Sequence, residues 1–410
     1  MSGMTGVLES ATLPSLSADL TEAVRALPGV LQRVEAAHPG VSLASFGAVE
    51  NELELLCASL AWHELNRALA VPLTQVSSGK SLEQMLQADP AQGRFLQFVL
   101  SCLEAEGWLE MQGDRLQWQA TSEVKARCAQ VSAATLAARY PAFSGLVELI
   151  EHCASYMVPV IQGRQDPLQV LFPAGNTDFL AQKSERVPDY SNLSQLRLAL
   201  QGFIDGLADG RRGRPLRILE VGGGTGMLTR PLVERLKGRS VEYVFTDIGR
   251  SFLLDARKHA RENGIGFMSF HRLDVSRNPA QQGFELGSYD LVLALDVVHA
   301  TADVRQTAAH IRSLLVPGGA LCLIELVKEH RWTHLVFGLL AGWWAFTDAP
   351  LRVRSPLLDR NTWGSVLREA GFTDVLLLPG GEPTGARAEK VLAVAVSQQP
   401  LGSNRWSEVS

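Results

Sequence analysis

The sequence predicts an α/β protein built on a mostly parallel, seven-stranded Rossmann-like sheet, preceded by a mostly α-helical domain. Leu216 to Gly226, L-R-I-L-E-V-G-G-G-T-G, reads as a short apolar strand that ends in a glycine turn. An amphipathic helix, M-L-T-R-P-L-V-E-R-L-K, follows directly. Four further apolar strands end in polar residues, which is how a parallel sheet forms a ligand crevice along one edge.

The glycine turn limits the kind of ligand that this crevice binds. Gly222, Gly223 and Gly224 allow a sharp backbone turn and close approach of a ligand. No Lys-Ser or Lys-Thr pair ends the turn, and its spacing differs from the G-x-G-x-x-G of dinucleotide sites. Glu220 would repel a pyrophosphate but suits a positive charge, such as the amino and sulfonium groups of S-adenosylmethionine (SAM). On this stretch alone, a glycine turn of another α/β protein remains the alternative.

The next two strands end in acids that suit a nucleoside. Val241 to Ile248 ends at Asp247, about 20 residues after the glycines, where a carboxylate accepts hydrogen bonds from ribose hydroxyls. The third strand, F-M-S-F-H-R-L-D-V, ends at Asp274. We expect Asp274 to accept from an adenine amino group, with Val275 against the ring, and Ile248 and Leu295 to complete the cofactor site.

The fourth and fifth strands supply candidate catalytic residues. Y-D-L-V-L-A-L-D-V-V-H-A has Asp296 and His299 at its end, and A-L-C-L-I-E-L ends in Glu325. A histidine can be a neutral base near pH 7. A carboxylate on one imidazole nitrogen fixes the tautomer and stabilises the cation formed on proton abstraction. Because the two strands are neighbours, His299 and Glu325 are predicted to form a catalytic pair.

The sequence resembles the class I SAM-dependent methyltransferase domains of polyketide synthases. The resemblance rests on L-E-V-G-G-G-T-G, L-D-V-V-H-A-T, L-L-V-P-G-G-A-L, L-I-E-L, F-G-L-L-A-G-W-W-A-F, L-F-P-A-G and V-P-D-Y-S-N. It implies SAM as cofactor, S-adenosylhomocysteine as product, and His299 and Glu325 as the catalytic pair. It further implies that the chain methylates the α-carbon of a β-ketoacyl thioester. The acceptor would be held by phosphopantetheine on an acyl carrier protein, among neighbouring synthase domains. Tyr190 and Asn192 match a lid motif of the family, with Tyr190 as a third catalytic candidate.

Other functions remain open at this stage. An O-methyltransferase acting on a β-hydroxyl or enol, carrier-bound or on a free small molecule, also needs a base. A SAM-binding but non-catalytic domain is a third possibility, which the intact Glu220, His299 and Glu325 disfavour. We expect no catalytic metal, because no ligand cluster stands out in the sequence.

The composition also indicates which partners, cysteine chemistry and compartment to expect. The net charge of −5 disfavours nucleic-acid binding. Five scattered cysteines in apolar surroundings predict reduced core thiols. The sequence offers no signal-peptide pattern and no apolar stretch of 18 residues, so we expect a cytoplasmic protein without a membrane span.

The domain organisation follows from changes in composition along the chain. We predict an N-terminal linker and helix at 1–40, a helical lid domain with a winged-helix-like part at 41–208, and a SAM-binding core at 209–400. The connector D-G-R-R-G-R-P marks the main boundary. A tail follows at 401–410.

Two further segments each admit a functional and a structural interpretation. In the lid domain, the helix Gly93 to Glu106 holds only one base, Arg94, so it is not a DNA-recognition helix. An insertion at 328–361 is rich in tryptophan and phenylalanine. These aromatics are either core, or an apolar wall for an acyl chain with Arg352 and Arg354 near its mouth for an acidic carrier or a phosphate.

Overall fold

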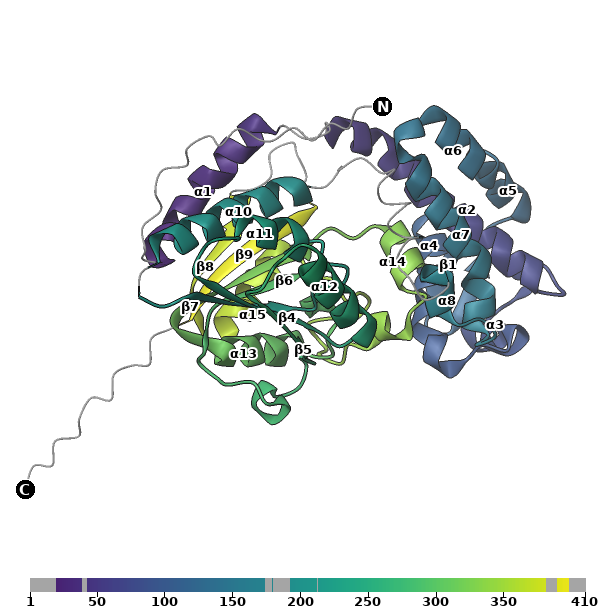
Figure 1. The fold of residues 1–410 in the computed structure, drawn as a ribbon. Coiled ribbons are helices and arrows are strands. Elements are labelled where there is room, and N and C mark those ends of the chain that lie inside the picture. Colours follow the sequence, from purple (N-terminus) through teal and green to yellow (C-terminus); the bar gives the residue numbers. More distant parts are fainter. Residues whose placement is uncertain are drawn as a thin grey trace, which may run out of the picture.

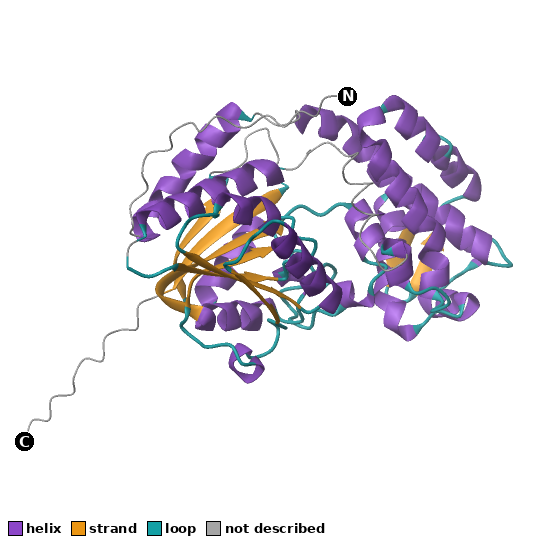
Figure 2. Cartoon of the chain, viewed as in Figure 1, coloured by secondary structure: helices purple, strands orange, loops and turns teal. Residues whose placement is uncertain are grey.

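The protein has two lobes, an α/β lobe and a mostly helical lobe (Figure 1). The computed structural model describes residues 20–38, 43–173, 179, 192–211, 213–380 and 389–397. Figure 2 shows that the large sheet belongs to the α/β lobe and that a small hairpin lies in the helical lobe. The predicted fold class is therefore confirmed.

The sheet has the strand order β5-β4-β3-β6-β7-β9-β8. Its strands are β3 (Leu216–Val221), β4 (Val241–Asp247), β5 (Met268–Arg272), β6 (Tyr289–Leu295), β7 (Leu315–Leu326), β8 (Phe372–Leu378) and β9 (Lys390–Ser397). The strands β3 to β7 pair in parallel, and β9 runs antiparallel between β7 and β8, as predicted for the last strand. The carboxyl ends of β3, β4, β6 and β7 therefore meet at one edge.

Helices cover both faces of this sheet. One face packs against α1 (Leu20–Ala37), α10 (Leu193–Gly210), α11 (Thr229–Arg235) and α12 (Arg250–Glu262). The other face packs against α13 (Val304–Leu314) and α15 (Arg360–Glu369). The apolar side chains of α10 recur at three- and four-residue steps, and Leu196, Leu200, Phe203 and Leu207 are all buried. The sheet is thus buried on both faces, which explains its apolar strands.

The described part of the helical lobe consists of short and long helices and one β-hairpin. They are α2 (Leu43–Ala68), α3 (Gly79–Leu86), α4 (Gly93–Ala105), β1 (Leu109–Gln112), β2 (Arg115–Trp118), α5 (Thr121–Cys128), α6 (Ala133–Arg139), α7 (Ser144–Ile161) and α8 (Pro167–Leu171). The hairpin of β1 and β2 follows α4, with Gly113 in the left-handed region at the hairpin turn. Arg94 on α4 donates to the carbonyl oxygens of Trp344 and Phe346, so it serves a contact between the lobes.

The insertion after β7 joins the two lobes. Its helix α14 (Arg331–Phe337) and the 3₁₀ helix η7 (Ala341–Trp344) pack on the helical lobe (Figure 1). Leu335, Trp344 and Phe346 share a buried core with α2, α4 and α7. Both interpretations of the aromatic insertion therefore find support, because Trp344 and Phe346 are core whereas Trp332, Phe337 and Trp343 are half-buried.

The predicted domain limits differ from the packing in one respect. The predicted lid domain includes residues 193–208, and the predicted N-terminal linker and helix include α1, yet α1 and α10 pack on each other and on the sheet. The glycine- and arginine-rich connector marks where the chain turns into β3, but composition does not show which lobe covers an apolar helix face.

Two predictions from composition can be compared with the structure. All five cysteines are buried and free, and burial raises the pKa of Cys102, Cys153 and Cys322 to about 12, as expected of inert core thiols. Among the helices of the described residues, none combines the length and hydropathy needed to cross a membrane.

Candidate functional site

The glycine turn after β3 is tightly packed on one side and open on the other. Gly222 has φ +62°, and a Cβ there would lie 2.6 Å from Val297 Cγ2. A Cβ on Gly223 would clash with the ring of Phe245. At Gly224, by contrast, the atom nearest to an added Cβ would be the Gly222 carbonyl oxygen at 3.9 Å. The turn thus needs glycine for packing, and it leaves free space beside Gly224.

Two acids lie at or just after the ends of β4 and β5, and one of them contacts this turn directly. Asp247 accepts hydrogen bonds from the N–H groups of Gly224 (2.9 Å) and Gly249 (2.7 Å). Asp274 lies two residues beyond the end of β5, slightly later than predicted, and accepts from the N–H of Ser276 at 3.1 Å. Each carboxylate has further lone pairs with which it can accept hydrogen bonds.

These residues fit the nucleoside part of the predicted cofactor. Ile248 follows Asp247 and is 63% exposed, an apolar side chain at the crevice that a base could cover. Leu295 is half-buried at the end of β6, and Val275 is 4% exposed. Free space at Gly224, acceptors on Asp247 and Asp274, and apolar neighbours suit a ligand with hydroxyl and amino groups.

Glu220 lies beneath the turn. It is 2% exposed, and its Oε2 accepts from the hydroxyls of Thr229 (2.5 Å) and Tyr243 (2.7 Å). Burial raises the pKa of Glu220 from 4.5 to about 7, against the lowering effect of these two hydrogen bonds. Its carboxyl group therefore exchanges its proton near neutral pH, which allows the charge of a bound ligand to decide its ionisation.

The raised pKa of Glu220 implies that the free energy of unfolding depends on pH. The folded protein holds the Glu220 proton more tightly than the unfolded chain, so that contribution is present below pH 4.5 and lost as pH rises to about 7. Glu220→Gln should therefore gain stability over the wild type as pH rises, by up to about 3 kcal/mol at pH 8. Urea unfolding of the cofactor-free protein between pH 5 and pH 8 measures this difference. Glu242→Gln, at an exposed position of β4, is the control for the chemical exchange itself, and a profile for Glu220→Gln that does not change with pH would contradict the prediction.

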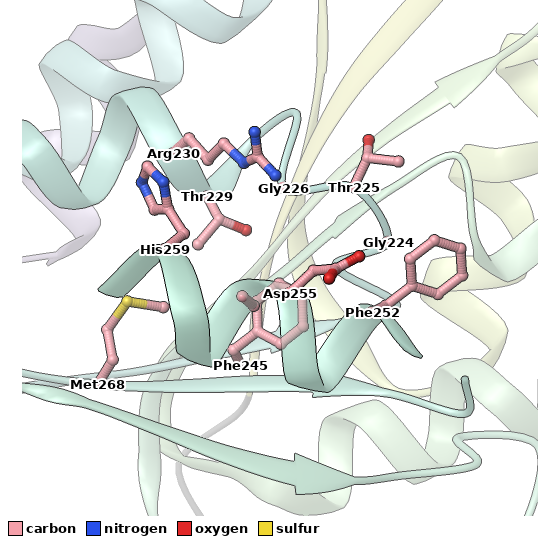
Figure 3. Close-up of a pocket in the computed structure, with 11 residues that line it drawn as sticks. Gly224, Thr225, Gly226, Thr229, Arg230, Phe245, Phe252, Asp255, His259 and Met268 are labelled. Atoms are coloured by element: carbon pink, nitrogen blue, oxygen red, sulfur yellow. The ribbon is translucent and has the colours of Figure 1, made fainter. Parts of the chain in front are cut away.

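A small hollow lies behind the turn, between α11 and α12 (Figure 3). Its lining includes Gly224, Thr229 and Arg230 on one side, and Phe252 and His259 on α12 on the other. Its volume of about 20 Å³ is too small for a nucleoside. The hollow thus borders the predicted cofactor site without being that site.

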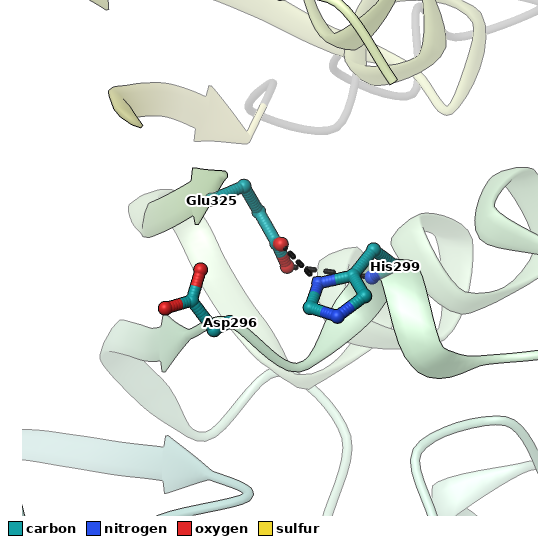
Figure 4. A group of neighbouring side chains, drawn as sticks. All are labelled: Asp296, His299 and Glu325. Carbon is teal, nitrogen blue, oxygen red and sulfur yellow. Dashed lines mark hydrogen bonds and ion pairs between the residues drawn. The ribbon is translucent and has the colours of Figure 1, made fainter. Parts of the chain in front are cut away.

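The predicted catalytic pair is brought together at the sheet edge (Figure 4). His299 lies on the 3₁₀ turn η6 (Val298–Ala300) after β6, and its Nδ1 is 2.5 Å from Oε2 of Glu325 on β7. The other oxygen of Glu325 accepts from the N–H groups of Val297 (3.2 Å), Val298 (2.8 Å) and His299 (3.4 Å). Both side chains are buried, at 5% and 0% exposure. Glu325 therefore fixes the turn and the imidazole together.

Opposing effects set the basicity of His299. Burial lowers its pKa, but the charge of Glu325 and the hydrogen bond to it raise the pKa by more, so the net shift is upward. With Glu325 facing Nδ1, the Nδ1–H tautomer is favoured and Nε2 bears the lone pair. The pair can therefore accept a proton at Nε2.

An aromatic wall stands beside the imidazole. The rings of Trp343 and His299 meet edge to face with centroids 5.2 Å apart. Trp343 donates from Nε1 to Nδ1 of His334 at 3.0 Å, and burial lowers the pKa of His334 to about 4. A neutral His334 can accept this hydrogen bond, so it holds Trp343 in place. No sequence pattern indicated this pairing of Trp343 with His334.

Asp296 completes the edge beside the pair (Figure 4). Atoms of Asp296, His299 and Glu325 that could bind a metal lie within 4.8 Å of one another. Both carboxylates already have partners, however, since Lys390 contacts Asp296 and backbone N–H groups surround Glu325. This arrangement favours acid–base chemistry, and the absence of a metal stays a prediction.

Arg352 does not lie at a mouth for a carrier, which corrects one sequence interpretation. It is 2% exposed and pairs with Asp348 at 2.7 Å. Its guanidinium also donates to the carbonyl oxygens of His299 (2.6 Å), Thr301 (2.7 Å) and Ala302 (3.1 Å). Arg352 thus stabilises the loop that presents His299. Arg354 is exposed.

The structure contains a second buried His–Glu pair, which no sequence pattern indicated. His330 Nε2 lies 2.5 Å from Glu389 Oε2, and both residues are almost fully buried. Lys328 contacts Glu389 (3.3 Å) and also Glu50 on α2 (2.5 Å). The cluster joins the insertion, the start of β9 and the helical lobe. Only the tertiary fold brings these distant residues together, so no local pattern could predict it.

Comparisons with known proteins agree with this geometry. A family model described as a methyltransferase domain matches residues 219–321. The crystal structure of the CurJ carbon methyltransferase is similar with a TM-score of 0.81 at 31% identity, covering 93% of this chain and 100% of that one. The polyketide synthase ThaQ of Burkholderia thailandensis is 37% identical over 60% of this chain, and the non-reducing polyketide synthase ausA of Aspergillus calidoustus is 32% identical over 87%.

The chain spans only 12% and 15% of the lengths of those two synthases. The similarity to the CurJ domain, in contrast, extends over the whole of that domain and over both lobes of this chain. The strand order, the glycine turn and the acids after β4 and β5 all agree with a SAM-dependent enzyme. The chain therefore belongs to the SAM-dependent methyltransferase domains of polyketide synthases.

Proposed function

We propose that this domain is a C-methyltransferase that methylates the α-carbon of a β-ketoacyl thioester held on an acyl carrier protein. The observation that supports this most is the buried His299–Glu325 pair, with 2.5 Å between Nδ1 and Oε2, at the edge of the sheet that also bears the predicted cofactor residues. The CurJ relative is described as a carbon methyltransferase, and so is DszA, which is 28% identical with a TM-score of 0.75.

The chemistry divides between the cofactor and this pair. SAM supplies an electrophilic methyl group and leaves as S-adenosylhomocysteine. His299 Nε2 takes the α-proton of the β-ketoacyl group, and the C–H electron pair becomes that of an enolate. Glu325 stabilises the resulting imidazolium through Nδ1–H. The α-carbon then bonds to the methyl group, and the imidazolium later loses its proton to solvent.

The cofactor site that we propose consists of the turn and the strand ends. Its residues are Glu220, Gly222, Gly223, Gly224, Asp247, Ile248, Asp274, Val275 and Leu295. Asp247 would accept from ribose hydroxyls and Asp274 from the adenine amino group. Glu220 lies beneath the turn, so its charge would act on the cofactor's cationic groups across the turn. Tyr190, the third catalytic candidate, lies outside the described residues and stays a prediction.

The acceptor site would lie beside Trp343. An indole held against His299 gives an apolar surface on which an acyl chain can lie. The phosphopantetheine arm of the carrier would bring the chain there, and neighbouring synthase domains would supply it. O-methylation of a β-hydroxyl or enol is the alternative, since that proton also needs a base.

Intact-protein mass spectrometry of loaded carriers tests the proposal. An acetoacetyl carrier incubated with SAM should gain one methyl on the α-carbon, and His299→Ala should abolish the gain. A gain on a 3-hydroxybutyryl carrier but not on the ketone would move the assignment to oxygen. Undiminished activity of His299→Ala would refute the role of the pair.

A further inference from the structure

Asp296 is held in an unusual backbone conformation next to the catalytic pair. Its φ is +52°, a left-handed value that is uncommon outside glycine. Its N–H donates to the Ile324 carbonyl oxygen at 2.8 Å, and its Oδ1 accepts from the Leu326 N–H at 3.1 Å. Strain of this kind persists only where the surrounding structure enforces it, and it is most common at functional sites. The carboxylate of Asp296 is thus fixed beside β7.

Lys390, on the neighbouring strand β9, is also held in place by several contacts. It begins β9 directly across from Leu326, is 9% exposed, and its Nζ contacts Oδ2 of Asp296. The side chain of Asn192 donates to its carbonyl oxygen at 2.9 Å and accepts from its N–H at 3.0 Å. Asn192 belongs to the D-Y-S-N motif, so one role of that motif is to anchor Lys390. A buried cation with so little freedom must be paired, and Asp296 is its partner.

Several charged or titratable groups face His299. They are Glu325 on β7, Asp296 after β6, Lys390 on β9, His334 on α14 and Arg352 after η7. Arg352 is paired with Asp348, and His334 is neutral above about pH 4. The charges that act on the imidazole without being balanced elsewhere are therefore those of Glu325, Asp296 and Lys390.

Without Lys390, these two carboxylates would favour a charged imidazole. Asp296 raises the pKa of His299 and Lys390 lowers it, because like charges disfavour and opposite charges favour the protonated ring. An imidazolium cannot accept a proton. A base flanked by two carboxylates therefore needs a counter-charge to stay neutral near pH 7.

We propose that Lys390 and Asp296 form a charge-balancing pair that keeps His299 available as a proton acceptor. The inference rests on the proposed function, since the pair acts through His299. Both residues are positioning residues, because neither needs to touch the substrate.

The pH dependence of kcat/KM for methyl transfer tests this pair, because the two variants should move it in opposite directions. Lys390→Met removes the positive charge and should shift the acidic limb upward by about one pH unit. Asp296→Asn removes the negative charge and should shift it downward by a similar amount. The double variant should return close to the wild-type limb, and Lys390→Arg should retain it. Shifts in the same direction, or no shift in correctly folded variants, would overturn the proposal.

A second measurement separates this inference from the proposed role of His299. The imidazole of His299 can be titrated by NMR in the cofactor-free protein labelled at histidine, with its signal assigned by its loss in His299→Ala. Opposite movements of this titration in Lys390→Met and Asp296→Asn would support the charge balance without any activity assay. If those movements occur while His299→Ala remains active, the catalytic role fails and the charge balance stands. If they do not occur, the charge balance fails whatever the activity shows.

Discussion

Glu325→Gln is expected to lower kcat for methyl transfer by about 10²–10⁴-fold while the protein stays folded. One oxygen of Glu325 accepts from three successive backbone N–H groups of the turn that bears His299. A glutamine oxygen can replace that acceptor, so the turn should persist. The amide nitrogen must then face Nδ1 of His299.

This exchange reverses the tautomer of the base. An amide N–H pointing at Nδ1 makes that nitrogen the acceptor and places the ring proton on Nε2. In the proposed mechanism Nε2 accepts the substrate proton, so the variant would hold its base in the wrong tautomer. It also lacks the carboxylate charge that stabilises an imidazolium. Both effects lower kcat, whereas the affinity for SAM should change only a few-fold.

The chain offers a matched control for this exchange. Glu389 pairs with His330 at the same 2.5 Å and is as deeply buried, but it lies at the contact between the lobes. Glu389→Gln should leave kcat within a few-fold of the wild type. Single-turnover kinetics with a loaded carrier measure the rate of methyl transfer, and calorimetry measures the affinity for SAM. A Glu325→Gln variant with wild-type kcat would show that the pair does not act as a base.

The pair was predictable because it depends on a topological rule. Side chains at the ends of neighbouring parallel strands meet at one edge, so His299 and Glu325 could be paired from their positions alone. The same rule located Asp247. Lys390 was not predictable in this way. It reaches Asp296 only because β9 inserts antiparallel between β7 and β8, which brings the start of β9 beside the end of β7.

The insertion shows a second limit of sequence reasoning. Its density of aromatic residues indicated burial or an apolar wall, without showing which ring does what. In the fold Trp344 is buried in the core of the helical lobe, whereas Trp343 is half-buried at the border of that core and meets His299. The choice depends on where α14 docks, which local patterns do not encode. For the same reason Arg352 resembled a carrier contact in the sequence, although its donors all turn inward.

Arg352→Met should therefore act on folding and on kcat rather than on carrier binding. Removing the guanidinium leaves Asp348 as a buried, unpaired carboxylate and releases carbonyl groups of the loop that presents His299. Breaking a buried ion pair on one side costs about 3–5 kcal/mol. We expect the free energy of unfolding to fall by this amount, with a lower kcat in the protein that remains folded.

The neighbouring Arg354 separates this role from carrier recognition. Arg354 is exposed, so Arg354→Met should change the free energy of unfolding by about 0.5 kcal/mol or less. Urea unfolding of both variants, together with KM for a carrier-bound and a pantetheine-bound acceptor, decides between the two roles. A structural Arg352 lowers stability and affects both acceptors alike. If Arg352→Met keeps the wild-type stability and raises KM only for the carrier-bound acceptor, Arg352 acts in carrier binding and the structural role is wrong.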